Sequence, residues 1–263
     1  DLHSFPTRRS SDLNLFANDV NCDGLVLDPN CFTTLAFVAL SEEGERTFSF
    51  ARKPGADTQL RPEELRRDVI ENSRVFHVGS LSLTDEPARS ATIAALDVAK
   101  AAGAVMSYDP NYRDSLWTSA EVASEQMRSI VTYMDLIKIS CEETELLTGR
   151  SDPTEAARIL LGQGAQVICV TLDDEGALVA TKDGSATVPS FKVDAVDTTG
   201  AGDSFWGGFL CAFVDADIRP ENVTLDDARS FARFGNAVAS LCVRRRGAIP
   251  AMPTLDEVEK VLS

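Results

Sequence analysis

Short apolar runs alternate with longer segments of helical character from residue 75 onward, and this alternation constrains the fold more than any other feature of the chain. The runs at 75–79, 104–108, 135–139 and 166–171 have the length and composition of buried strands. Helices are expected at 61–72, 88–102, 119–132, 142–148, 153–163, 203–215 and 225–243, and from residue 255. Alternation of this kind predicts an α/β fold, in which helices cover a mainly parallel central sheet.

Two segments depart from this rhythm, because each has β-rich runs on both sides of a polar turn that contains glycine. They lie at 33–50 and 176–189. Each segment predicts an antiparallel hairpin. The second one would add an antiparallel edge to the otherwise parallel sheet.

The charge balance restricts the partners of the chain. Its 263 residues contain 41 acidic and 25 basic side chains, which gives a formal charge of −16 and a pI near 4.5. A chain of this charge repels nucleic acid and anionic membranes, so a small-molecule enzyme is the better interpretation. An anionic substrate would need a locally positive site made of backbone N–H groups, basic side chains or a metal ion.

Cysteine usage and hydropathy indicate a cytoplasmic protein. The six cysteines are scattered and form no Cys-x-x-Cys pair, and most lie beside apolar residues, so we expect buried, reduced thiols. No apolar stretch approaches the length of about 20 residues that a membrane span requires.

The first residues differ from the rest of the chain. Residues 1–13 are basic, rich in serine and without an apolar period. We interpret them as a foreign or disordered leader that resembles a translated sequencing adapter. Residues 14–263 are expected to form one domain whose N-terminal part is missing.

A glycine-containing loop precedes the apolar helix predicted at 203–215. Its sequence at 197–203 is Asp-Thr-Thr-Gly-Ala-Gly-Asp. Small residues leave backbone N–H groups open to an approaching phosphate, and the helix dipole favours negative charge there. Asp203 could accept the proton of an attacking hydroxyl, or it could simply cap the helix while the glycines form a turn. The loop matches neither a Walker loop nor a dinucleotide fingerprint.

Polar clusters follow three of the predicted strands. They lie at 109–113, 140–143 and 171–176. Ligands of open parallel sheets bind outside the carboxyl ends of the strands, so these clusters and the Gly200 loop are expected to converge on one crevice.

The loop at 197–203, followed by Phe205 and Gly207-Gly208-Phe209, resembles the second signature of the ribokinase/PfkB-type carbohydrate kinases. The resemblance extends from about residue 25 onward. It implies a ribokinase-like three-layer α/β/α sandwich with a partial β lid at 33–50, and a homodimer as the full-length state. It further implies that Asp203 is the general base and that the amides of Gly200, Ala201 and Gly202 form an anion hole.

Other motifs extend the resemblance to the nucleotide and the metal ions. Ser140-x-x-Glu143 is similar to the N-x-x-E motif of the family, which positions Mg²⁺ through water, and Asp197 and Thr199 match a monovalent-cation loop that implies K⁺. The segment 171–176 resembles a T-L-G-x-x-G loop, with Asp173 where glycine is usual. The implied ATP contacts are Thr171, Asp173, Gly176, Gly202 and Asn236.

The segment 109–113 resembles the acceptor loop of fructokinases and 2-keto-3-deoxygluconate kinases, which implies substrate contacts from Asp109, Asn111 and Arg113. Arg113 could instead be an exposed loop residue. The function expected first is ATP-dependent phosphorylation of fructose to fructose 6-phosphate. One alternative is a 2-keto-3-deoxygluconate kinase. The other is a catalytically incomplete nucleotide-binding fragment, because the early sugar-binding Asp and the G-G-x-x-x-N motif of the family are absent.

Overall fold

The computed structural model describes residues 15, 17–40 and 46–263, which divide into two compact units. The smaller unit comprises residues up to 74 together with 82–104, and the larger comprises 75–81 and 105–263. The leader predicted at 1–13 lies outside the described residues. No helix of the described part is both long and apolar enough to cross a lipid bilayer.

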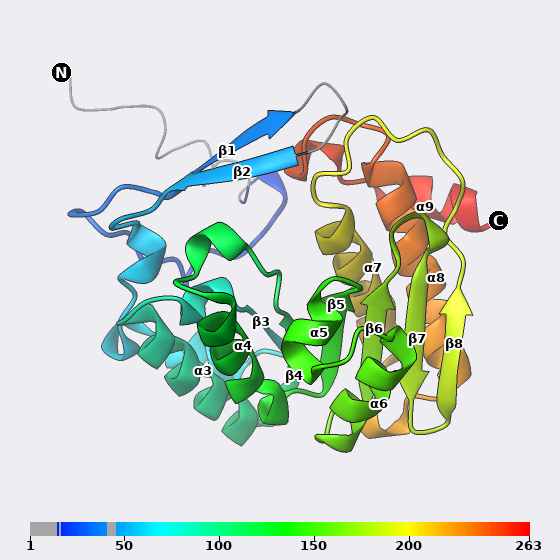
Figure 1. Cartoon of the computed structure of the whole chain (residues 1–263), viewed down its shortest axis with the longest axis horizontal. Helices are drawn as coiled ribbons and strands as arrows, with labels where there is room; N and C mark the ends of the chain where they lie inside the picture. The colour runs from blue at the N-terminus through cyan, green and yellow to red at the C-terminus, as the bar shows by residue number, and fades with distance from the viewer. Residues whose placement is uncertain (1–14, 16, 41–45) are drawn as a thin grey trace. The chain divides into compact units, whose positions relative to one another are not determined.

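The larger unit is built on a six-stranded sheet in the order β3-β4-β5-β6-β7-β8 (Figure 1). Its strands are β3 (Val75–Gly79), β4 (Val105–Asp109), β5 (Leu136–Ser140), β6 (Val167–Thr171), β7 (Ala177–Thr181) and β8 (Gly184–Val188). The first four are parallel, and β7 and β8 are antiparallel to their neighbours. The predicted parallel sheet with an antiparallel hairpin at one edge is confirmed.

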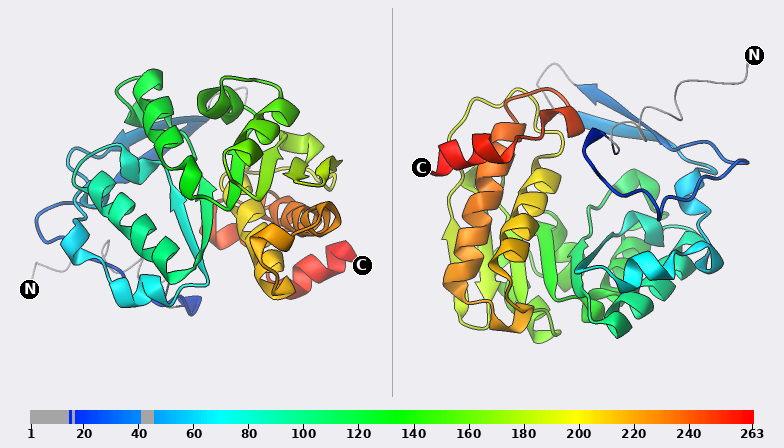
Figure 2. Two further views of the ribbon diagram at one scale, coloured as in Figure 1. Left: turned by 90° about the horizontal axis from the view of Figure 1, so that it is seen from below. Right: turned by 180° about the vertical axis from the view of Figure 1, so that it is seen from behind.

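Helices cover both faces of this sheet. The larger unit contains α4 (Ala120–Ser129), α5 (Glu143–Thr148), α6 (Pro153–Gly162), α7 (Ala201–Ala216), α8 (Leu225–Cys242) and α9 (Leu255–Leu262). Figure 1 shows α5 and α6 in front of the sheet, and the view from behind in Figure 2 shows α7 and α8 against the opposite face. The unit is therefore an α/β/α sandwich, as expected.

Aromatic side chains on α7 form the centre of one core layer. Phe205, Trp206, Phe209 and Phe213 are all buried. Trp206 stacks on Phe209 with ring centroids 4.8 Å apart, and Phe231 of α8 packs edge-on against Phe209 at 5.6 Å. This packing fixes α7, so the N-terminus of the helix has a fixed position relative to the sheet.

The smaller unit contains the first hairpin and one long helix. Strands β1 (Leu35–Leu40) and β2 (Arg46–Ala51) pair antiparallel, and the hairpin predicted at 33–50 is confirmed, although its turn at 41–45 lies outside the described residues. Helix α3 (Ala88–Ala102) ends at Gly103, whose φ of 79° is left-handed. Glycine adopts this conformation without a Cβ penalty, so it stops the helix where the sequence predicted.

The helix predicted at 61–72 is wrong in its continuity. The structure contains a 3-10 turn at Pro62–Glu64 and a short helix, α2 (Arg67–Glu71), with extended backbone between them. Arg66 interrupts the helix, because its guanidinium binds the Asp68 carboxylate and the Asp23 carbonyl instead of extending along a helix surface.

The expectation of buried thiols is also wrong in part. All six cysteines are free, but Cys141 and Cys211 are exposed while Cys169 and Cys242 are buried. On α7 the core-facing positions are 209 and 213, so position 211 points away from the core despite its apolar neighbours.

Candidate active site

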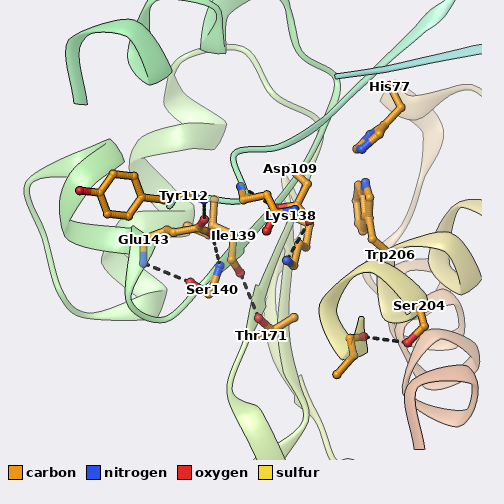
Figure 3. A network of polar contacts seen from close by, with 12 residues as sticks. His77, Asp109, Tyr112, Lys138, Ile139, Ser140, Glu143, Thr171, Ser204 and Trp206 are labelled. Carbon is orange, nitrogen blue, oxygen red and sulfur yellow. Dashed lines mark hydrogen bonds and ion pairs between the residues drawn. The ribbon is translucent and has the colours of Figure 1, made fainter. Parts of the chain in front are cut away.

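The three predicted polar clusters meet where the central strands of the sheet have their carboxyl ends. Asp109, Ser140 and Thr171 are the last residues of β4, β5 and β6. These strands are adjacent and parallel, so their carboxyl ends lie side by side (Figure 3). The three clusters therefore lie side by side, as the sequence predicted.

The glycine turn is held in place by Asp197. Its Oδ1 accepts hydrogen bonds from the Thr199 amide at 2.9 Å and the Thr199 hydroxyl at 2.7 Å, and its Oδ2 accepts one from the Gly247 amide at 2.9 Å. Gly200 has a φ of 78°, and a methyl group there would lie 2.8 Å from the Ala248 Cβ. The turn therefore needs glycine at 200 both for its backbone conformation and for close packing.

Helix α7 begins two residues earlier than predicted. Gly200 is its N-cap, and the Ser204 amide donates to the Gly200 carbonyl at 2.8 Å. Ala201 and Gly202 thus belong to the first helical turn, and Asp203 is its third residue with an exposed side chain. The Ala201 amide donates to the Thr198 carbonyl at 3.1 Å. Amides of a first turn face outward along the helix axis, where an anion can approach them.

Lys138 is a site residue that the sequence interpretation missed. It lies on β5 and is buried, with its Nζ 2.9 Å from the Asp109 Oδ2. A methyl group placed on Gly202 would lie 2.9 Å from the same Nζ, so the ammonium contacts the start of α7. Lys138 therefore connects the start of α7, directly after the Gly200 turn, to the carboxyl end of β5. A single charged residue inside the apolar run at 136–139 was the available signal.

Negative charge accumulates around this ammonium. Burial raises the pKa of Asp109 to about 6, the Lys138 ammonium opposes this rise, and the carboxylates of Glu143 and Asp203 add to it. A cation or a cation-bound phosphate entering the site would find several carboxylate oxygens nearby.

Glu143 connects two of the site loops. It is buried, and its Oε1 accepts the Tyr112 amide at 2.6 Å while its Oε2 accepts the Ser140 amide at 2.7 Å (Figure 3). The Ser140 hydroxyl in turn accepts the Glu143 amide at 3.3 Å. A carboxylate has about four lone-pair positions, so each oxygen keeps capacity for a water molecule.

The predicted acceptor residues lie at the end of β4, where Asp109 is the last residue of the strand and Asn111 and Arg113 follow on the loop. The Asn111 amide donates to the Asp109 Oδ1 at 3.1 Å, and Asn111 has a left-handed φ of 49°. The Arg113 Nη1 donates to the Tyr112 carbonyl at 2.7 Å, and the side chain is half-buried. Asp109 and Glu143 thus fix this loop from both ends.

The predicted nucleotide residues fall into two groups. Thr171 is the last residue of β6, and Asp173 lies on the loop that follows, with a left-handed φ of 51°. Gly176 and Asn236 instead meet the backbone at 188–190. The Asn236 Nδ2 donates to the carbonyls of residues 188 and 189 at 3.0 and 3.1 Å, and a methyl group on Gly176 would lie 2.2 Å from the former carbonyl. Asn236 is buried on α8 rather than exposed on the surface of the helix.

His77 lies on β3, an edge strand of the described sheet, and its ring is partly buried. Its Nδ1 lies 3.0 Å from the Ser107 hydroxyl, which also accepts the Trp206 indole N–H at 3.0 Å. Nearby protein displaces water from the ring and lowers the pKa of His77, while the Asp203 carboxylate opposes this shift and Lys138 adds to it.

Metal-ligating side chains do not form a closed cage at this edge. Within the described residues, no three His, Cys, Asp or Glu side chains gather closely enough to hold a metal ion. Glu143 could accept a metal-bound water, which suits Mg²⁺ because that ion keeps several of its waters.

The fold agrees with the comparisons to known proteins. The family model described as pfkB family carbohydrate kinase matches residues 13–255, so the chain belongs to this family. Probable fructokinase-4 from Arabidopsis thaliana is 46% identical over 250 residues, which cover 93% of this chain and 75% of that protein.

Solved structures give the same result. The fructokinase of Xylella fastidiosa with bound ATP has a TM-score of 0.85 and 34% identity, and the match covers 95% of this chain and 79% of that one. The fructokinase of Vibrio cholerae O395 in a fructose, ADP and calcium ion bound form has a TM-score of 0.87 and 32% identity, covering 99% and 83%. A double mutant of the latter is in a fructose, ADP and potassium ion bound form. The predicted ribokinase-like fold is confirmed.

Proposed function

We propose that this chain transfers the γ-phosphoryl group of ATP to the primary hydroxyl of fructose and forms fructose 6-phosphate. The observation that carries the proposal is the exposed Asp203 carboxylate in the first turn of α7, directly after the Gly200–Gly202 turn. A base beside an anion-binding helix start is the arrangement that this transfer requires. The fructokinase relatives support the choice of sugar.

In the proposed reaction Asp203 takes the proton of the hydroxyl. The sugar oxygen forms a bond to the γ-phosphorus, the bond to the bridging oxygen breaks, and ADP leaves. The amides of Gly200, Ala201 and Gly202 are proposed to stabilise the charge on the transferring group. The Ala201 amide already donates to a carbonyl, so it would share its hydrogen between two acceptors.

We propose Mg²⁺ as the metal that accompanies ATP, with Glu143 binding one of its waters. Asp197 and Thr199 are proposed as ligands of K⁺ below the turn. The Asp197 carboxylate accepts three hydrogen bonds that hold the turn, and a bound cation would interact with the same carboxylate and hold the turn further. Replacing K⁺ by Li⁺ in the assay, at constant ionic strength, tests this part of the proposal through a loss of turnover.

The remaining predicted contacts keep their assignment as proposals. Asp109, Asn111 and Arg113 are proposed at the acceptor sugar. The proposed nucleotide contacts are Thr171, Asp173, Gly176, Gly202 and Asn236. For two of them the supporting geometry is indirect, because Gly176 and Asn236 both pack on the backbone at 188–190 and would act by placing that segment.

The assembly and the location of the protein are further parts of the proposal. We propose that residues 14–263 act as one kinase domain in a cytoplasmic homodimer. Leu35 and Phe37 of β1 are 51% and 58% exposed, and exposed apolar side chains on a strand suit a subunit contact. Light scattering coupled to size-exclusion chromatography should give twice the mass of the chain, whereas a monomer would contradict the assembly.

A sugar panel tests the function. Production of ADP would be followed with ATP, Mg²⁺ and K⁺ in the presence of fructose, glucose, ribose or 2-keto-3-deoxygluconate. Fructose should give the highest kcat/KM. A preference for 2-keto-3-deoxygluconate would replace the proposed substrate and keep the chemistry, and nucleotide binding without turnover on any sugar would contradict a functional kinase.

A further inference from the structure

Lys138 occupies an environment that lysine rarely enters. It lies between Ile137 and Ile139 on a strand whose first four residues are buried, and only 6% of its own surface is exposed. Lysine is almost never fully buried unless it is paired, because the interior disfavours its charge. A specific use of this charge would explain its position.

The ammonium is held between a carboxylate and a helix start. Its Nζ lies 2.9 Å from the Asp109 Oδ2, and that carboxylate is also buried. On the other side it contacts Gly202, where a methyl group would lie 2.9 Å from the Nζ and 3.6 Å from the Cε. Glycine at 202 therefore leaves room for the lysine tip within the first turn of α7.

The helix start taken alone disfavours an ammonium at this position. The N-terminus of a helix carries partial positive charge, so an ammonium against it experiences repulsion. The Asp109 carboxylate compensates for part of this repulsion, and the carboxylates of Glu143 and Asp203 lie nearby, but only one of the three N–H donors of the ammonium is used by Asp109. An anion at the helix start would contact both the amides and the ammonium, which removes the repulsion.

We propose that Lys138 contacts the γ-phosphate of bound ATP and is a catalytic residue of the transfer, with Asp109 as the positioning residue that holds it there. The inference rests on the proposed function, since it assigns the anion at α7 to the group in transfer. The Lys138 ammonium would be one of the local positive charges that an anionic substrate needs in a chain of this acidity. The competing interpretation is that Lys138 only neutralises Asp109.

The test compares the binding of ATP and ADP without sugar, in the presence of Mg²⁺, by isothermal titration calorimetry. Lys138→Met should weaken ATP binding about 10- to 100-fold and leave ADP binding within about threefold of wild type, because only ATP carries the γ-phosphate. Lys182→Met is the matched control, since Lys182 is exposed on the β7–β8 turn, and it should change neither affinity.

Lys138→Met leaves the Asp109 carboxylate buried without its partner, so this variant could lose its fold. Near-UV circular dichroism identifies that case. The ATP and ADP titrations are then repeated with the Asp109→Asn/Lys138→Met double variant, which buries neither charge. A folded variant with an unchanged ratio of ATP to ADP affinity overturns the inference. If wild type phosphorylates no sugar but shows the Lys138-dependent ratio, the proposed function fails and this inference stands.

Discussion

Helices α7 and α8 approach each other closely at Gly208, and this contact predicts opposite effects for two neighbouring substitutions. A methyl group on Gly208 would lie 2.7 Å from the Val238 Cγ2 and 3.0 Å from the Gly235 Cα. A methyl group on Gly207 has nothing within 4 Å. Gly208→Ala should therefore force α7 and α8 apart, while Gly207→Ala should not.

The magnitude follows from two terms. Alanine is favoured over glycine inside a helix by about 0.5–1 kcal/mol, so Gly207→Ala should raise the free energy of unfolding by about that amount. Gly208→Ala gains the same term, but the overpacked contact costs about 1–3 kcal/mol. The helix term cancels in the difference between the variants, so Gly208→Ala should be less stable than Gly207→Ala by about 1–3 kcal/mol.

Urea unfolding followed by circular dichroism measures this difference, and thermal melting gives an independent value. A difference of this size corresponds to about 2–12 °C in Tm for a protein of this length. The close approach also fixes the helix that carries Asp203, so kcat of Gly208→Ala should fall with its stability. Equal stability of the two variants would refute the steric argument.

Two further predictions concern the site loops. Asp173→Gly should raise the free energy of unfolding by up to about 1 kcal/mol, because glycine adopts the left-handed φ of 51° without a Cβ penalty, and a lower midpoint in urea would contradict this. Burial raises the pKa of Asp109 to about 6 from an unfolded value of 3.8. Between pH 4 and 6 the folded state therefore binds more protons than the unfolded state. The free energy of unfolding should fall by about 1–3 kcal/mol as the pH rises through this window. Asp109→Asn lacks this titration, so its free energy of unfolding should not show this fall. If the free energies of unfolding of Asp109→Asn and wild type change in parallel across pH 4–7, the predicted effect of Asp109 is refuted.

The sequence predicted the arrangement of the larger unit well because its strands are continuous apolar runs. Helix ends with a strong local signal were also predictable, as Gly103 shows. The break at Arg66 was not, since the side chain binds the backbone carbonyl of Asp23, which lies 43 residues earlier. A helical pattern of charges contains no information about such a distant partner.

The candidate site was predictable in its loops and not in its contacts. Asp203 and the Gly200 turn follow from local sequence, because a helix start and its small residues are adjacent in the chain. Lys138 was missed because its partner Asp109 is 29 residues away, on the neighbouring strand. The amide of Asn236 likewise binds a carbonyl 48 residues away, and only the fold brings the two together.

The turnover of fructose by Asp203→Asn tests whether Asp203 is the general base. Asp203 is exposed, so this variant should keep the Tm and the ATP affinity of wild type close to unchanged, while kcat falls about 10²- to 10⁴-fold because the general base is lost. Asp215→Asn, an exposed position farther along α7, is the matched control and should retain full turnover. Turnover of Asp203→Asn within a few fold of wild type would show that Asp203 is not the general base.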